Sequence, residues 1–222
     1  MGGEMSGDTV EQAARPLLAV GHGSRVAASA AMLRVLVGNV AKLLPATDVR
    51  LGFIELSAPL LTDVLPELDE PVVVPLLLSR GTHVTRDLPA EAAPPLGPDP
   101  VLTQVLLERI AEAGIAPGTP LVLAGTGSAT SEGQQDVRTQ AGLLAEQWGA
   151  PVVAAFVTAA SPTVREAVSA VAAETGREPA VVSYFLAPGL LPDSAAATTR
   201  PLGDHPAVAE LVAARYRQVA GS

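Results

Sequence analysis

The feature that most constrains the fold is an internal repeat that runs through the whole chain. The stretch LLAVGHGSR at Leu17–Arg25 returns as LVLAGTGSAT at Leu121–Thr130. FIELSAP at Phe53–Pro59 returns as FVTAASP at Phe156–Pro162, and a later LGPDP returns as LGDHP. The offsets are 104, 103 and 106 residues. Offsets this constant indicate the duplication of one folding unit.

Within each repeat, short apolar runs alternate with longer segments of helical character. We expect strands at Leu17–Val20, Val49–Ile54, Val72–Leu78, Leu121–Ala124, Val152–Phe156 and Ala180–Leu186. We expect helices at Ala27–Leu44, Pro59–Leu68, Pro100–Ala113, Glu132–Trp148, Pro162–Thr175 and Ala207–Val219. Such alternation is typical of βαβ units on a parallel sheet that is buried on both faces. The sequence therefore predicts an α/β fold of two tandem, duplicated domains, each a parallel β-sheet flanked by helices, with a cleft between them.

The domain boundaries follow from the same repeat. A chain of 222 residues, 48% of them hydrophobic, is long enough to form two small cores. We expect a flexible N-terminus at 1–15, a first domain at 16–116 that carries the site, and a degenerate second domain at 117–222. The Gly- and Pro-containing segment at 114–119 is typical of a linker between them.

Composition excludes several classes of function. The absence of cysteine excludes disulfides, thiolate metal sites and cysteine nucleophiles. The net charge of −9 and the lack of a Lys/Arg cluster argue against a nucleic-acid partner. Residues 1–15 lack the basic start and apolar core of a secretory signal, and no apolar run is long enough to span a bilayer. We expect a cytoplasmic protein with no membrane partner.

Three residues whose side chains can bind a metal or transfer a proton follow the expected strands of the first repeat. His22 comes after the first strand, Glu55 ends the second, and His83 comes after the third. Ligands of open α/β sheets bind beyond the carboxyl ends of the strands, so these side chains are expected on one rim. Because apolar residues flank Glu55, we expect its carboxylate to be buried, where it needs a partner.

The second repeat lacks all three of these groups. Thr126 stands in place of His22, Thr158 in place of Glu55, and Leu191 in place of His83. One repeat therefore kept a site and the other kept only the scaffold.

Two imidazoles and a carboxylate suit a borderline divalent metal such as Co²⁺, Fe²⁺, Ni²⁺ or Zn²⁺. The same set could also move protons. No third strong ligand accompanies them, which fits a metal that is handed on rather than stored. Other interpretations stay open: His22 could only cap a turn, and its Gly-His-Gly-Ser segment could hold an anion at a helix start.

Three motifs, in order, carry a family resemblance. VGHGSR, FIELSAP and VVVPLLLSRGTHVTRDLP resemble the class II chelatases that insert a metal into sirohydrochlorin, in the cobaltochelatase and ferrochelatase group of cobalamin and sirohaem synthesis. The resemblance implies a two-lobed, ATP-independent chelatase with no tightly bound cofactor and a divalent metal (Co²⁺, Fe²⁺ or Ni²⁺) as substrate. It implies that His22 and His83 deliver the metal and that Glu55 is a third ligand or the proton acceptor.

The tetrapyrrole implied by the resemblance is rich in carboxylates, which need donors. Residues near the expected rim that could bind them are Arg25, Arg80, Arg86, Ser24, Ser79 and Thr82. The stretch after His83 is shorter than in the family, which keeps one alternative open: a tetrapyrrole- or metal-binding protein without turnover. Since the duplicated chain can form its own cleft, we expect a monomer or a homodimer.

Overall fold

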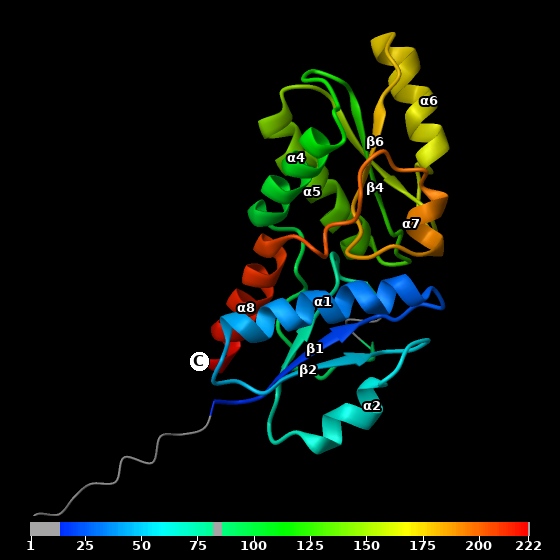
Figure 1. The fold of residues 1–222 in the computed structure, drawn as a ribbon. Coiled ribbons are helices and arrows are strands. Elements are labelled where there is room, and N and C mark those ends of the chain that lie inside the picture. Colours follow the sequence, from blue (N-terminus) through cyan, green and yellow to red (C-terminus); the bar gives the residue numbers. More distant parts are fainter. Residues whose placement is uncertain (1–13, 82–85, 222) are drawn as a thin grey trace, which may run out of the picture.

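The apolar runs of the two repeats form two small parallel sheets. The computed structural model describes residues 14–81 and 86–221, which fold into two lobes (Figure 1). The strand order is β2-β1-β3 in the first sheet and β5-β4-β6 in the second. The registers match as well: Leu17 pairs with Val49 in the first sheet, and Leu121 pairs with Val152 in the second. The predicted duplicated α/β fold is confirmed.

The elements lie close to the expected ranges. The strands are β1 (Leu17–Gly21), β2 (Val49–Phe53), β3 (Val72–Pro75), β4 (Leu121–Gly125), β5 (Val152–Phe156) and β6 (Ala180–Ser183). The helices are α1 (Ala27–Leu43), α2 (Leu61–Val64), α4 (Pro100–Glu112), α5 (Ser131–Trp148), α6 (Val164–Thr175), α7 (Leu190–Ser194) and α8 (Pro206–Ala220), with a 3₁₀ turn η1 (Leu65–Glu67) after α2. The expected flexible segment at 1–15 lies almost wholly outside the described residues.

The structure corrects the expected ranges at three places. The strands expected to run to Leu78 and Leu186 end at Pro75 and Ser183, because the central strands that they pair with end at Gly21 and Gly125. The helix expected at 59–68 is shortened to α2 and η1, a tighter 3₁₀ turn that begins at Leu65 and contains Pro66. The short helix α7 was not expected from the sequence.

Helix ends follow local sequence rules. Thr163 and Glu166 form a capping box at the start of α6, and the Thr130 side chain accepts a hydrogen bond from the Gly133 N–H at the start of α5. Both helices end at a glycine in the left-handed region, Gly149 with φ 73° and Gly176 with φ 67°. These signals lie in the sequence, which is why the ends of α5 and α6 were close to prediction.

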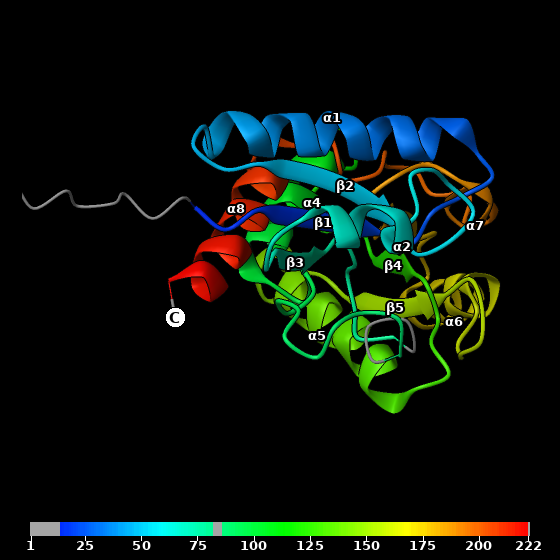
Figure 2. The ribbon, with the colours of Figure 1, turned by 90° about the horizontal axis from the view of Figure 1, so that it is seen from below.

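The two repeats are not separate bodies in space. Helix α8, at the end of the chain, packs against α1 and β3 of the first lobe, while α4 packs against α5 of the second lobe and against α8. Figures 1 and 2 both show the red C-terminal helix beside the first lobe. Two contacts join α8 and its N-cap residue to the α4 region: an ion pair between Arg215 and Asp99 at 2.9 Å, and a hydrogen bond between His205 and Glu108 at 2.8 Å. The proposed boundary at 116/117 therefore divides the sequence, whereas the lobes exchange helices across it.

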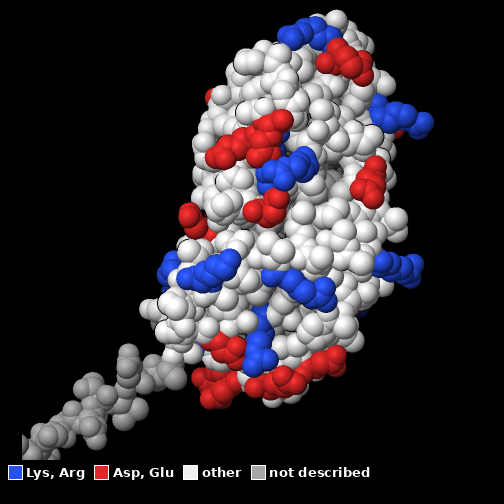
Figure 3. Space-filling view, viewed as in Figure 1, with Lys and Arg blue, Asp and Glu red and all other residues white. Residues whose placement is uncertain are grey.

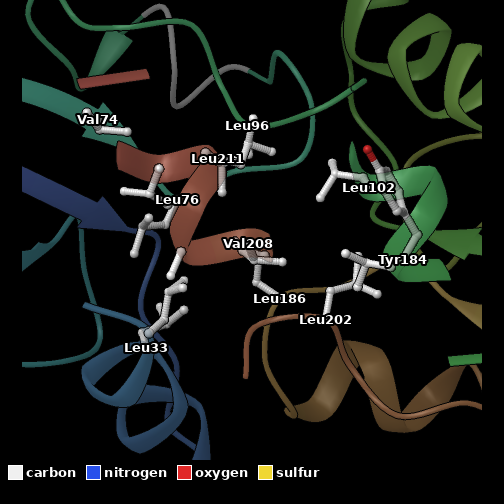
Figure 4. Packing of buried hydrophobic residues seen from close by; sticks show 14 of the residues in the cluster. Leu33, Val74, Leu76, Leu96, Leu102, Tyr184, Leu186, Leu202, Val208 and Leu211 are labelled. Carbon is white, nitrogen blue, oxygen red and sulfur yellow. The ribbon is translucent and has the colours of Figure 1, made fainter. Parts of the chain in front are cut away.

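One hydrophobic core runs through both lobes as a result. Figure 4 shows Leu76 of the first lobe and Leu186 of the second near Val208 of α8, with Tyr184 of the second lobe beside Leu102 of α4. All of these belong to a single cluster of buried residues.

On the face drawn in Figure 3, acidic and basic side chains are interspersed, with an acidic group at the far end of the first lobe. Within the described residues, no helix combines the length and apolar character needed to cross a membrane.

The glycines of the repeated turn explain why that turn is kept twice. In each repeat the turn after the central strand touches the backbone that follows the neighbouring strand. A Cβ at Gly23 would lie 1.7 Å from the Glu55 carbonyl oxygen, and one at Gly127 would lie 1.5 Å from that of Thr158. Neither position can hold a side chain unless the backbone moves.

We predict that Gly127→Ala lowers the free energy of unfolding by about 1–3 kcal/mol, because the new methyl group would overlap backbone. The matched control is Gly142→Ala on the exposed face of α5, where a Cβ meets no atom within 4 Å. That change should raise stability by up to about 1 kcal/mol. Urea unfolding followed by circular dichroism measures both. Equal stability of the two variants would contradict the explanation of the repeated turn.

Candidate functional site

The first-repeat rim brings His22 and Glu55 together. His22 directly follows β1, and Glu55 lies two residues beyond β2. The Glu55 backbone N–H donates to the His22 carbonyl at 3.0 Å, which fixes the two loops side by side. The side chains meet as well, with His22 Nε2 3.7 Å from Glu55 Oε1. Parallel strands that end at one edge produce this pairing, as expected.

The expectation that Glu55 is buried is wrong. Its side chain is 51% exposed and that of His22 is 38% exposed. Strand β2 ends at Phe53, which is fully buried, and the chain then turns out of the sheet through Leu56, whose φ is 62°. The apolar neighbours of Glu55 in sequence therefore do not surround its carboxylate, which faces the cleft.

The pair can contact one metal ion. Nitrogen and oxygen ligands lie about 2.0–2.2 Å from a first-row divalent ion, so two ligand atoms 3.7 Å apart are within reach of the same ion. Over 14–81 and 86–221, no group of three or more His, Asp or Glu side chains could hold a metal. The candidate ligand His83 and the candidate donor Thr82 lie outside the described residues, so their roles stay predictions.

Two adjoining cavities form the cleft between the lobes. One has a volume of about 380 Å³ and the other of about 570 Å³. Both are lined by His22, Leu76, Leu77, Thr126, Phe185 and Leu186, which come from both repeats. Thr158, the counterpart of Glu55, lines the smaller cavity. The predicted cleft is thus present, with the histidine on one wall and hydroxyl residues on the other. Cavities of this size suit a small-molecule ligand.

The residues predicted to donate hydrogen bonds to substrate carboxylates are divided between the two cavities and the outer surface. Ser24 and the exposed Arg25 line the larger cavity beside Glu55. The Ser24 hydroxyl accepts a hydrogen bond from the Val26 N–H at 3.1 Å at the start of α1. Ser79 lines the smaller cavity, and Arg86 is exposed outside both. Four of the predicted residues, His22, Ser24, Arg25 and Glu55, therefore share one wall.

Arg80 has a protein partner. Its guanidinium binds the Asp136 carboxylate on α5, with Nη2 2.6 Å from Oδ1 and Nε 3.0 Å from Oδ2. This hydrogen bond, together with the charge of the carboxylate, raises the pKa of Arg80 above its ordinary value. The guanidinium predicted to receive substrate carboxylates is thus held by the second lobe.

Sequence reasoning missed an apolar edge of the larger cavity. Leu190 and Leu191 on α7 are 68% and 40% exposed, and Leu56 is 49% exposed. All three line the cavity that also contains His22 and Glu55. Large exposed leucines grouped at a cavity mark a binding surface. No periodicity in the sequence distinguished them from core leucines, because only their position over the cleft exposes them.

Tyr184 is a second residue that the sequence did not reveal. It is buried beneath the smaller cavity, and its hydroxyl donates to the Leu78 carbonyl at 3.1 Å. Burial, and then the nearby charges of Asp136 and Asp99, raise the pKa of this phenol well above its usual range. Tyr184 therefore stays neutral and acts as a hydrogen-bond donor between the lobes.

Comparison with known proteins shows that this chain is similar in sequence to proteins named sirohydrochlorin cobaltochelatase. The chain is 31% identical over 78 residues to the sirohydrochlorin cobaltochelatase of Methanococcoides burtonii, an alignment that covers 33% of this chain and 60% of that protein. It is 35% identical over 79 residues to the enzyme of the same name from Sulfurisphaera tokodaii, covering 29% of this chain and 66% of that protein. These alignments thus span less than two thirds of either relative.

A solved structure agrees over nearly the full length. SirB from Bacillus subtilis with Fe³⁺ matches with a TM-score of 0.79 and 24% identity, over 92% of this chain and 95% of that one. At this identity the likeness supports the fold. The CbiX family model matches residues 16–113 and again 120–219. Since these two matches cover both repeats and most of the chain, the protein belongs to the CbiX family.

Proposed function

We propose that this protein is a sirohydrochlorin chelatase, a lyase that inserts Co²⁺ or Fe²⁺ into the tetrapyrrole without ATP. The observation that carries the proposal is the His22–Glu55 pair, 3.7 Å apart on the wall of a cleft between two CbiX repeats. Relatives named sirohydrochlorin cobaltochelatase, and SirB solved with Fe³⁺, support the choice of reaction and substrates. The pathway would be cobalamin or sirohaem synthesis, in the cytoplasm.

Metal insertion sets three tasks for the site. Water must leave the ion, the ion must be presented to the ring face, and two pyrrole N–H protons must be removed as the ion enters. A neutral imidazole can hold the ion, and its affinity for metal falls when it is protonated. We assign this task to His22, with His83 as a second ligand.

Glu55 is suited to receive the protons. A carboxylate near the ring nitrogens acts as a general base, and its exposure to the cleft lets it pass each proton on to water. Because two protons leave as one divalent ion arrives, the charge of the ring core does not change. Glu55 can also contact the ion itself through the oxygen that lies close to His22.

The rest of the cleft suits a flat, acidic macrocycle. The exposed leucines Leu56, Leu190 and Leu191 offer an apolar surface to the ring face. Arg25 lies on the same cavity and can bind a peripheral carboxylate, and Ser24 and Ser79 are weaker donors. The two repeats provide both walls of this cleft, so we propose that a monomer suffices and that a homodimer is not required. The metal is a substrate here, and we propose no tightly bound cofactor.

Anaerobic metal insertion tests the proposal. Purified protein is mixed with sirohydrochlorin and, in separate reactions, Co²⁺, Fe²⁺ or Ni²⁺, and the absorbance of the metallated ring is followed beside enzyme-free controls. Faster insertion with protein supports a chelatase, and the ranking of rates identifies the preferred metal. Tight tetrapyrrole binding without acceleration would favour the alternative, a tetrapyrrole- or metal-binding protein on a chelatase scaffold, which the short stretch after His83 suggests.

We predict that His22→Ala weakens Co²⁺ binding at least about tenfold, because it removes the imidazole ligand from the cleft. Isothermal titration calorimetry without tetrapyrrole measures this. The matched control is His205→Ala, which removes a histidine that pairs with Glu108 and lines none of the cleft. Equal Co²⁺ affinity of the two variants would remove His22 from the metal site.

We predict that Glu55→Gln lowers the insertion rate by about 10²–10⁴-fold, because the amide cannot accept a proton. His22→Ala should abolish turnover. Thr126→Ala, the change at the counterpart of His22 in the second repeat, should have little effect. Stopped-flow absorbance at saturating metal measures all three rates. Equal losses from the two repeats would show that the chemistry is not confined to the first.

A further inference from the structure

A buried carboxylate of the second repeat holds an edge of the cleft that belongs to the first. Asp136 lies on α5 with a side chain that is only 2% exposed. It accepts hydrogen bonds from the Arg80 guanidinium and also from the Arg80 backbone N–H, the latter at 2.7 Å. A buried carboxylate requires such partners, so its bonds fix both the side chain and the main chain of Arg80.

Two further contacts fasten the same segment to the second lobe. The Thr130 hydroxyl donates to the Arg80 carbonyl at 3.3 Å, and the Tyr184 hydroxyl donates to the Leu78 carbonyl at 3.1 Å. Gly133 lies so close that a Cβ there would be 2.3 Å from the Arg80 carbonyl oxygen. The segment 78–80 is thus held at three backbone groups by the opposite lobe.

This segment forms one side of the smaller cavity. Ser79 and Gly81 line that cavity together with His22, and Ser128 of the second repeat faces them. A Cβ at Gly81 would lie 3.9 Å from the Ser128 hydroxyl oxygen, which shows how closely the two sides approach. The width of the cavity beside His22 therefore depends on where the segment docks.

The Arg80–Asp136 contact occurs at only one of the two equivalent positions that the repeats create. At the repeat offset of 104 residues the counterpart of Asp136 is Met32, and at the local offset of 108 residues the counterpart of Arg80 is Pro188. Neither counterpart can form an ion pair. The pair that joins Arg80 of the first repeat to Asp136 of the second therefore has no counterpart with the two repeats exchanged.

We propose that Asp136 is a positioning residue for tetrapyrrole binding, which sets the width of the cleft beside His22 by holding the segment 78–81. This rests on the proposed function. Asp136 does not touch the substrate in this scheme, and Arg80 serves as its partner rather than as a carboxylate receptor.

The test is Asp136→Asn, which keeps the size of the side chain and removes its charge. We expect faster amide hydrogen exchange over 76–81 and about tenfold weaker binding of metal-free sirohydrochlorin, measured by fluorescence quenching. Amide hydrogen exchange over 21–23 and 54–56 should stay unchanged, because the loops of His22 and Glu55 are held by their own backbone hydrogen bonds. The matched control is Asp99→Asn, which breaks the partly buried pair with Arg215 outside both cavities and should leave sirohydrochlorin affinity unchanged.

A double-mutant cycle with Arg80→Gln separates positioning from direct binding. If the pair acts as a unit, each single change weakens sirohydrochlorin binding and the double change weakens it no further. If Arg80 instead binds the substrate directly, Arg80→Gln weakens binding while Asp136→Asn, which releases the guanidinium, does not. That second pattern would overturn the proposal, as would unchanged exchange over 76–81 in Asp136→Asn. A wild-type chain that fails to bind sirohydrochlorin would refute the proposed function, and the exchange measurement would still decide whether Asp136 holds the segment.

Discussion

The exchange of helices between the repeats is the constraint on which the rest of the structure depends. Each sheet has only three short strands, so each needs helices packed against it to form a stable core. Helix α8, at the end of the second repeat, packs on α1 and β3 of the first, and α4 packs on α5 of the second. One core therefore joins both lobes (Figure 4). Because the lobes share that core, their relative position is set by packing, and the cleft between them has defined walls.

Duplication and divergence acted on different parts of this structure. Backbone contacts of the Gly-x-Gly-Ser turn occur twice: Ile54 N–H donates to the Gly21 carbonyl in the first repeat, as Val157 N–H does to the Gly125 carbonyl in the second. Side chains that project from this shared backbone differ. His22 faces the cleft on one wall and Thr126 on the other. The same scaffold thus supports a histidine–glutamate pair on one side and a neutral, hydroxyl-bearing surface on the other.

The prediction from sequence was most accurate for features that depend on neighbouring residues in the chain. It was least accurate for the burial of side chains and for contacts between residues distant in sequence. The parallel sheets, the duplication and the meeting of His22 with Glu55 follow from apolar runs and from the common edge of parallel strands. The burial of Glu55 was mispredicted because its apolar neighbours are in sequence and not in space. Arg80 was assigned to the substrate since no sequence pattern pairs it with Asp136, 56 residues away. The apolar edge formed by Leu190 and Leu191 was missed for the same reason.

The sequence by itself determined the repeated α/β architecture, the helix caps, and the presence of one histidine-bearing turn and one without it. These properties depend on the hydrophobicity of short runs and on the φ angles that glycine allows, both of which are local. Only the tertiary structure decided which helix covers which sheet, that Asp136 binds Arg80, and that Glu55 is open to the cleft. Those outcomes depend on side chains distant in sequence competing for the same buried volume, and on charges that must find partners once water is excluded.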